Sequence, residues 1–232
     1  MLLEICLRKN LNSLLTKIII NTNFKKKLNI VKKIIPIILI TLYLSSCGNS
    51  KPVKDETLTS FMLGGIYFIN GYGGIESTNG MMIDAGYTSD ADLISGYKQI
   101  FEFPFERTEK SGSKRVLKEW WDITDKTSLL EEIENLKTRE YAHKAWDYAR
   151  IVNNACIAYS AEYLSKDEVK KITNETLVLA RKDFENWNDY YTNFDLGRTD
   201  WNPEDEQGES FESIAKNITS YPNSIYTILP LK

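Results

Sequence analysis

The residues best suited to chemistry are a carboxylate and a guanidinium group separated by one helical turn. Asp147 precedes Arg150 by three positions, and Trp146 precedes it by four. At helical spacing the acid and the base can form an ion pair, and the guanidinium group can lie near the indole ring. The pattern favours a structural pair, in which Asp147 orients Arg150 toward a second acid such as Asp122. An Arg150 that faces a ligand is the alternative.

A second candidate arginine follows a glycine near the C-terminal end of the chain. Arg198 comes directly after Gly197 and shortly before Trp201, in a stretch, 197–203, that we expect to be a loop. Loops carry binding residues more often than cores do. We therefore expect Arg198 to close over the helices, either as a structural contact or as a contact to an anionic ligand.

Hydrolysis would require two carboxyl groups held at a fixed distance in a cleft. The candidates are Asp122, Asp147, Glu162 and Asp189. Their positions along the chain do not predict such a pair. An envelope hydrolase acting on cell-wall sugar or peptide is therefore an alternative interpretation, and we predict no catalytic residue.

Metal and thiol chemistry have little support. His143 is the single histidine, which rules out a multi-histidine metal site and argues against a Ser-His-Asp mechanism. Of the three cysteines, only Cys156 lies in the part of the chain expected to fold, and its place on an apolar stripe predicts a core residue. We predict no metal and no cofactor.

The N-terminal segment has the order of a bacterial lipoprotein leader. Five lysines between positions 25 and 33 precede an apolar run of 11 residues, 34–44, which is too short for the roughly 20 residues that span a bilayer. Leu44-Ser45-Ser46-Cys47 resembles a lipobox. We therefore expect a leader over 1–46 with its signal peptide at about 25–46, lipid on Cys47, a tether over 47–57 and a location in the cell envelope. A plain signal peptide is the alternative.

Charge divides the chain at the same place. Residues 1–46 hold 8 of the 29 Lys and Arg and 1 of the 32 Asp and Glu, so the remaining 186 residues have 21 basic and 31 acidic side chains, or −10. An acidic surface argues against nucleic acid as a partner. Together with a high content of Tyr and Trp, it favours a protein partner.

Helical periodicity dominates after residue 88 and predicts an all-α, single compact multi-helix domain over 58–232. Ser165 and Glu168 form a capping box, in which a hydroxyl and a carboxylate satisfy free backbone N–H groups at a helix start. We expect a loop over 106–113. The expected helices cover 61–69, about 90–103, the stretch around 116–121, a helix from about 126, one beginning near 140, 166–192, and 209–218.

Several clusters together resemble the bacterial family known as domain of unknown function 1266 (DUF1266), over roughly residues 115–203. The resemblance implies an α-helical domain and no established reaction. The matching segments are Trp121-Asp122-Ile123, Ala145-Trp146-Asp147-Tyr148-Ala149-Arg150, Tyr163-Leu164-Ser165 with Glu168, and then Phe184, Trp187, Tyr191, Gly197-Arg198 and Trp201.

We therefore expect a membrane-anchored, non-enzymatic helical lipoprotein that binds a protein partner, in one version as an immunity-like protein that blocks a basic toxin. The alternatives are the hydrolase above and a sensor of a small anionic ligand built around Arg150 and Arg198. The candidate polar site comprises Asp122, Trp146, Asp147, Arg150, Arg198 and Trp201.

Overall fold

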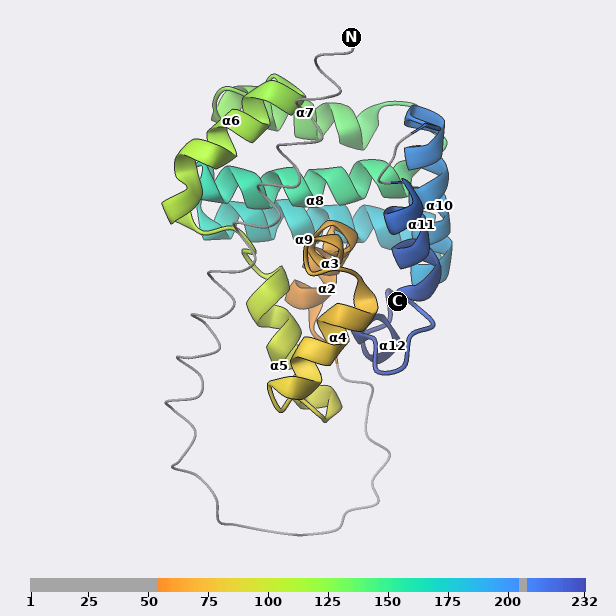
Figure 1. The fold of residues 1–232 in the computed structure, drawn as a ribbon. Helices are drawn as coiled ribbons and strands as arrows, with labels where there is room; N and C mark the ends of the chain where they lie inside the picture. The colour runs from red at the N-terminus through yellow and green to blue at the C-terminus, as the bar shows by residue number, and fades with distance from the viewer. Residues whose placement is uncertain (1–53, 205–207) are drawn as a thin grey trace. The chain divides into compact units, whose positions relative to one another are not determined.

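The computed structural model describes residues 54–204 and 208–232 (Figure 1). The predicted leader and the predicted lipidation site, Cys47, lie outside the described residues. Pro52–Lys232 forms one compact unit. Within its described residues the regular structure consists of the α-helices α2 to α12 and one short 3-10 helix, with no strand. The predicted all-α fold is confirmed.

Two long helices in the middle of the unit, α8 (Lys144–Ser160) and α9 (Lys166–Asp183), form its framework. They lie side by side and are joined by a tight turn (Figure 1). The predicted capping box is present, since Ser165 accepts from the Glu168 backbone N–H and Glu168 accepts from the Ser165 backbone N–H. Most of α8 is buried, and Cys156 is fully buried in it as expected. Side chains on α8 can therefore reach several neighbouring helices.

A helical hairpin covers one side of α8. It comprises α6 (Lys110–Trp121) and α7 (Lys126–Thr138), preceded by the 3-10 turn Arg107–Glu109. The polar loop predicted over 106–113 is therefore wrong, because the 3-10 turn leads directly into α6. Between the two helices Asp122 adopts a left-handed conformation (φ 54°), and Asp125 caps α7 together with Ser128.

The N-terminal helices are α2 (Glu56–Met62), α3 (Gly65–Gly71), α4 (Ile75–Asp84) and α5 (Asp90–Phe101). The single helix expected over 61–69 is broken at Leu63 and Gly64. The break is held in place by buried tyrosines: Tyr191 and Tyr226 donate to the Met62 carbonyl at 2.6 and 2.9 Å, and Tyr190 donates to the Leu63 carbonyl. These hydroxyl groups satisfy carbonyls that the ended helix leaves without partners.

The C-terminal helices differ most from the prediction. The helix expected over 166–192 ends at Asp183, where Phe184 becomes extended (φ −128°, ψ 143°), and Asn186 caps the next helix. That helix, α10 (Trp187–Trp201), contains Gly197, Arg198 and Trp201, so the loop predicted over 197–203 is also wrong. Helices α11 (Gly208–Asn217) and α12 (Ile225–Ile228) complete the unit.

Gly197 lets α10 cross closely over the start of α8. A Cβ atom at this position would lie 2.7 Å from the His143 Cβ and 2.8 Å from the Trp146 Cβ, closer than side-chain atoms approach one another. The glycine therefore marks a helix crossing, and the crossing brings Trp201 against Trp146.

Candidate functional site

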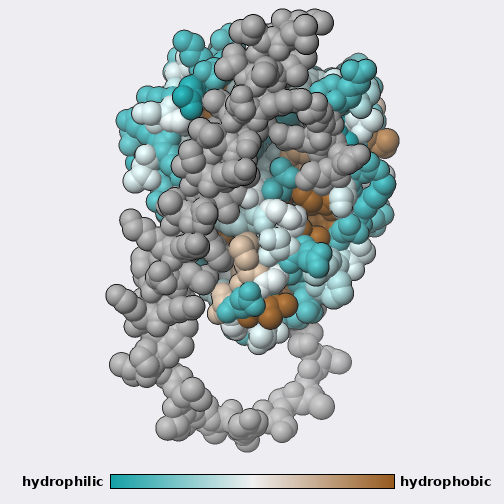
Figure 2. Space-filling model, in the orientation of Figure 1, coloured by the Kyte–Doolittle hydropathy of each residue, from teal (hydrophilic) through white to brown (hydrophobic). Residues whose placement is uncertain are grey.

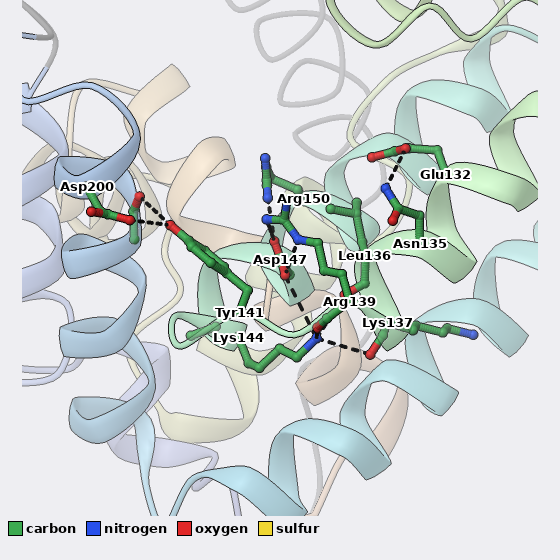
Figure 3. A network of polar contacts seen from close by, with 12 residues as sticks. Glu132, Asn135, Leu136, Lys137, Arg139, Tyr141, Lys144, Asp147, Arg150 and Asp200 are labelled. Atoms are coloured by element: carbon green, nitrogen blue, oxygen red, sulfur yellow. Dashed lines mark hydrogen bonds and ion pairs between the residues drawn. The ribbon is translucent and has the colours of Figure 1, made fainter.

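The candidate site is built around Asp147, a carboxylate with no exposed surface in the first turn of α8. Arg139, at the end of α7, donates to it from Nε at 2.9 Å and also from Nη2. Arg150 donates to the same carboxylate from one turn further along α8. Figure 3 shows the two guanidinium groups approaching Asp147 from different sides. The hydrogen bonds that Arg139 donates to the Asp147 carboxylate raise the pKa of Arg139.

The predicted pairing of Asp147 with Arg150 is therefore present. The second acid expected beside Arg150, Asp122, is instead exposed at the C-terminal cap of α6. The additional partner is a second cation, Arg139, which pairs with Asp147. Sequence spacing within one helix could not identify Arg139, because it belongs to the segment that joins α7 to α8. A buried carboxylate requires such partners, since a single buried charge is very costly.

Positive charge exceeds negative charge around this carboxylate. Lys144 lies 4.0 Å from it and donates to the carbonyls of Leu136, Lys137 and Arg139 at 3.4, 3.2 and 2.6 Å. Lys144 thereby fixes the end of α7. Three cations thus surround one carboxylate, and further negative charge near them would be stabilised.

The Arg150 guanidinium group contacts two indole rings. Its central carbon is 3.6 Å from the ring centre of Trp146 and 5.3 Å from that of Trp121. The first of these contacts is the one that the sequence spacing predicted. Because it contacts two rings and pairs with Asp147, the guanidinium group has little freedom to move.

Further aromatic rings extend the site toward solvent. Tyr141 lies 6.2 Å and Trp201 5.7 Å from Trp146, measured between ring centres, and Arg139 lies 4.6 Å from the Tyr141 ring. The Tyr141 hydroxyl donates to the Gly197 carbonyl at 3.3 Å and lies 3.2 Å from an Asp200 carboxylate oxygen. Trp201 remains 55% exposed. We call Arg139, Tyr141, Trp146, Arg150 and Trp201 the aromatic–arginine face.

Tyr67 of α3 lies behind this face. Its ring packs at 5.8 Å from that of Phe194 and 5.7 Å from that of Phe211. Burial raises the pKa of Tyr67 to about 12, against the opposing effects of the Arg150 charge and of a hydrogen bond with Trp146. Tyr67 therefore remains a neutral phenol beside the site. No spacing signal links it to residues about 80 positions later in the sequence, so sequence reasoning missed it.

Arg198 is held within its own helix. It is 8% exposed, and its Nη2 lies 3.2 Å from the carboxylate of Asp195, one turn earlier in α10. The expectation of a loop arginine closing over the helices is therefore wrong, because α10 continues through this position. Of the predicted polar site, the structure joins Trp146, Asp147, Arg150 and Trp201.

Three of the four carboxylates considered for hydrolysis have structural partners. Asp147 is held by two arginines, Glu162 pairs with Lys110, and Asp189 accepts from the Glu185 backbone N–H at 3.0 Å. The arrangement is suited to binding, since Asp147 is committed to orienting guanidinium groups. In the described part of the chain no group of three or more His, Cys, Asp or Glu is placed to hold a metal ion. Burial raises the pKa of the Cys156 thiol, which disfavours its reactive thiolate form.

Comparison with known proteins finds a family match over part of the chain. Residues 137–231 match the family model described as "Protein of unknown function (DUF1266)", so the predicted resemblance to this family is confirmed. The match begins after Trp121 and Asp122 and extends through α11 and α12, beyond the 115–203 that the sequence motifs indicate. No curated protein and no solved structure matches the chain. Among the described residues no helix has the length and apolarity needed to cross a membrane.

Proposed function

We propose that the region of this chain that matches the DUF1266 model forms the centre of a non-enzymatic protein-binding domain, held at the cell envelope by lipid on Cys47. Its binding surface is the aromatic–arginine face. The partner docks against Trp201 and Tyr141, and the arginines recognise polar or charged groups next to these rings.

The observation that carries this proposal is the half-exposed Trp201 in tilted ring contact with Trp146, which itself covers Arg150. Trp, Tyr and Arg are the residues that most often dominate protein–protein binding energy. Such residues are most effective when they are fixed before binding, because less side-chain entropy is lost on association. Arg150 is fixed by Asp147 and two rings, and Tyr141 is fixed by its hydroxyl contacts with Gly197 and Asp200.

The described surface as a whole has scattered rather than continuous apolar exposure. Most of the described surface visible in Figure 2 is hydrophilic or intermediate, and hydrophobic residues gather in small patches. The exposed large apolar side chains include Ile83, Val178 and Leu196, besides Trp120 and Trp201. Trp201 differs from the aliphatic members of this set because its ring contacts Trp146, which in turn contacts the Arg150 guanidinium group.

The experiment that tests the proposal is an affinity pull-down from native membranes, with a tag after Lys232. We expect a partner in near-stoichiometric amount with the wild-type chain and its loss with Trp201→Ala. Leu196→Ala is the matched control, since Leu196 is 54% exposed and lies on the same helix. Retention of the partner by Trp201→Ala, with both variants folded, would show that this face is not the binding surface.

A small anionic ligand is the second candidate, favoured by the excess of Arg139, Lys144 and Arg150 over Asp147. This alternative predicts that a small dicarboxylate or phosphate compound raises the melting temperature of the purified chain and that Arg150→Met abolishes the increase. Equal increases in the melting temperatures of the wild type and of Arg150→Met would contradict a ligand site at Arg150.

A further inference from the structure

Helix α6 lines a groove that is rich in exposed cations. Lys114, Arg115 and Lys118 border a cavity of about 430 Å³ together with Glu119, Thr124 and Tyr163. The cations are exposed, and the Lys114 ammonium group lies 5.2 Å from the centre of the Tyr163 ring. The groove thus combines three positive charges with one carboxylate, in a chain that carries −10 after residue 46.

Arg115 and Lys118 form no ion pair with any carboxylate of the described residues. Neighbouring lysines are paired: Lys110 contacts Glu162, and Lys126 contacts Glu168. Carboxylates are therefore paired with the lysines that flank the groove, whereas Arg115 and Lys118 within it have no ion pair among the described residues. Such cations are available to a partner.

The groove continues toward the aromatic–arginine face. Lys114, Lys118 and Trp121 follow one another at steps of four and three along α6, so they share one side of the helix. The Trp121 ring also contacts the Arg150 guanidinium group. We call Lys114, Arg115, Lys118 and Arg150, connected by Trp121, the basic tract.

We infer that the basic tract binds an acidic, extended polypeptide segment of the protein partner, an inference that rests on the proposed function. Lys114 and Trp121 are separated by about 10 Å along the helix, at ~1.5 Å per residue, which is too long for one small anion to span. Alternate side chains of an extended chain are ~6.6 Å apart, close to the ~6 Å rise between Lys114 and Lys118. Acidic residues at alternate positions therefore match the spacing of the cations.

Charge also favours a peptide over an anionic membrane. A peptide contacts the tract locally, and charges further away than the Debye length of ~8 Å at physiological salt are largely screened. A flat anionic bilayer would bring many of the acidic residues of this chain close to negative headgroups. The acidic segment therefore fits the distribution of charge better than the membrane does.

The test measures fluorescence anisotropy of a labelled ten-residue peptide of alternating glutamate and serine, with the full chain purified from membranes in a neutral detergent. We expect binding that weakens with added salt, and no binding of the matching glutamine–serine peptide. Lys118→Glu should weaken binding at least about tenfold, since it replaces an attraction by a repulsion. Lys182→Glu is the matched control, since Lys182 is exposed, forms no ion pair with a described residue and lies at the far end of α9. The affinity of this variant for the acidic peptide should stay within about twofold of wild type.

Four results would each overturn the inference. The glutamine peptide could bind as tightly as the acidic peptide, or both lysine variants could weaken binding equally. Millimolar inorganic phosphate could displace the acidic peptide, or Lys118-dependent binding could occur only with vesicles that contain phosphatidylglycerol.

The assay needs no native partner, so it separates the two proposals. If capture of a partner requires Trp201 but is unaffected by Lys118→Glu, the proposed function is supported and the binding of an acidic segment is rejected. If the acidic peptide binds but no partner is captured, the binding of an acidic segment is supported and the proposed function is rejected.

Discussion

A buried carboxylate between two arginines is the feature on which the candidate site depends. Asp147 has no exposed surface, and both Arg139 and Arg150 donate to it. The pairs hold the guanidinium groups beside Tyr141 and Trp146, so one side chain organises both charge and ring positions. When one partner of a buried ion-pair network is removed, the remaining charges stay buried without compensation, and the free energy of unfolding falls.

Asp147→Asn tests this dependence at the scale of a single residue. An amide has nearly the same volume but no charge, so two guanidinium groups would be left without their counter-ion. We expect a loss of about 3–5 kcal/mol in the free energy of unfolding, measured by urea titration. Glu175→Gln, which removes the partner of Lys137 at the surface, should lose several times less. Equal losses would mean that the Asp147 pairs are no stronger than a surface ion pair.

The candidate site could be predicted where its contacts lie within one helix. The spacing of Trp146, Asp147 and Arg150 predicts both the ion pair and the contact with the indole ring. Arg139, Tyr141 and Tyr67 could not be found in this way. They reach the site from a connecting segment and from a helix near the N-terminus, and such contacts depend on how the helices pack.

At the scale of the element, caps were easier to predict than the ends of helices. The sequence pattern of Ser165 and Glu168 predicts the capping box that begins α9, and capping boxes of the same kind at Ser89 and Asp125 begin α5 and α7. The boundary between α9 and α10 has no comparable signal, because Phe184, Trp187 and Tyr191 continue the apolar spacing of α9. All three are buried, so the same pattern serves two helices.

Gly197→Ala should be destabilising although alanine favours helices. The added Cβ would meet two Cβ atoms, those of His143 and Trp146, which cannot move without shifting the start of α8. We expect a loss of about 1–3 kcal/mol by thermal or urea unfolding, as for other over-packed contacts. We also expect weaker partner capture, because Trp146 and Trp201 would move apart.

Gly112 in α6 is the matched control for this prediction. A Cβ at Gly112 has no heavy atom within 4 Å, so Gly112→Ala should gain up to about 1 kcal/mol from helix propensity alone. A gain at both positions would show that α10 and α8 can separate without cost and that the crossing does not fix the aromatic–arginine face.

At the scale of the whole molecule, the proposed anchor and the folded unit lie close together along the chain. Helix α2 begins at Glu56 and is capped by Asp55, and Glu56 pairs with Arg181. Residues 48–55 would span at most about 30 Å when fully extended. A lipid on Cys47 would therefore keep the domain near the membrane surface, and its partner would have to be reached there.

Metabolic labelling tests the anchor on which this geometry depends. We expect radiolabelled palmitate to enter the wild-type chain and Cys156→Ala, and to be absent from Cys47→Ala. The two variants remove the same chemical group, but Cys156 is fully buried in α8 whereas Cys47 follows the lipobox-like sequence. Intact mass of the membrane-purified protein should show a chain that begins at Cys47. Radiolabel in Cys47→Ala, or a mature chain that begins at another residue, would contradict a lipid anchor on Cys47. The pull-down would then be repeated on the soluble fraction.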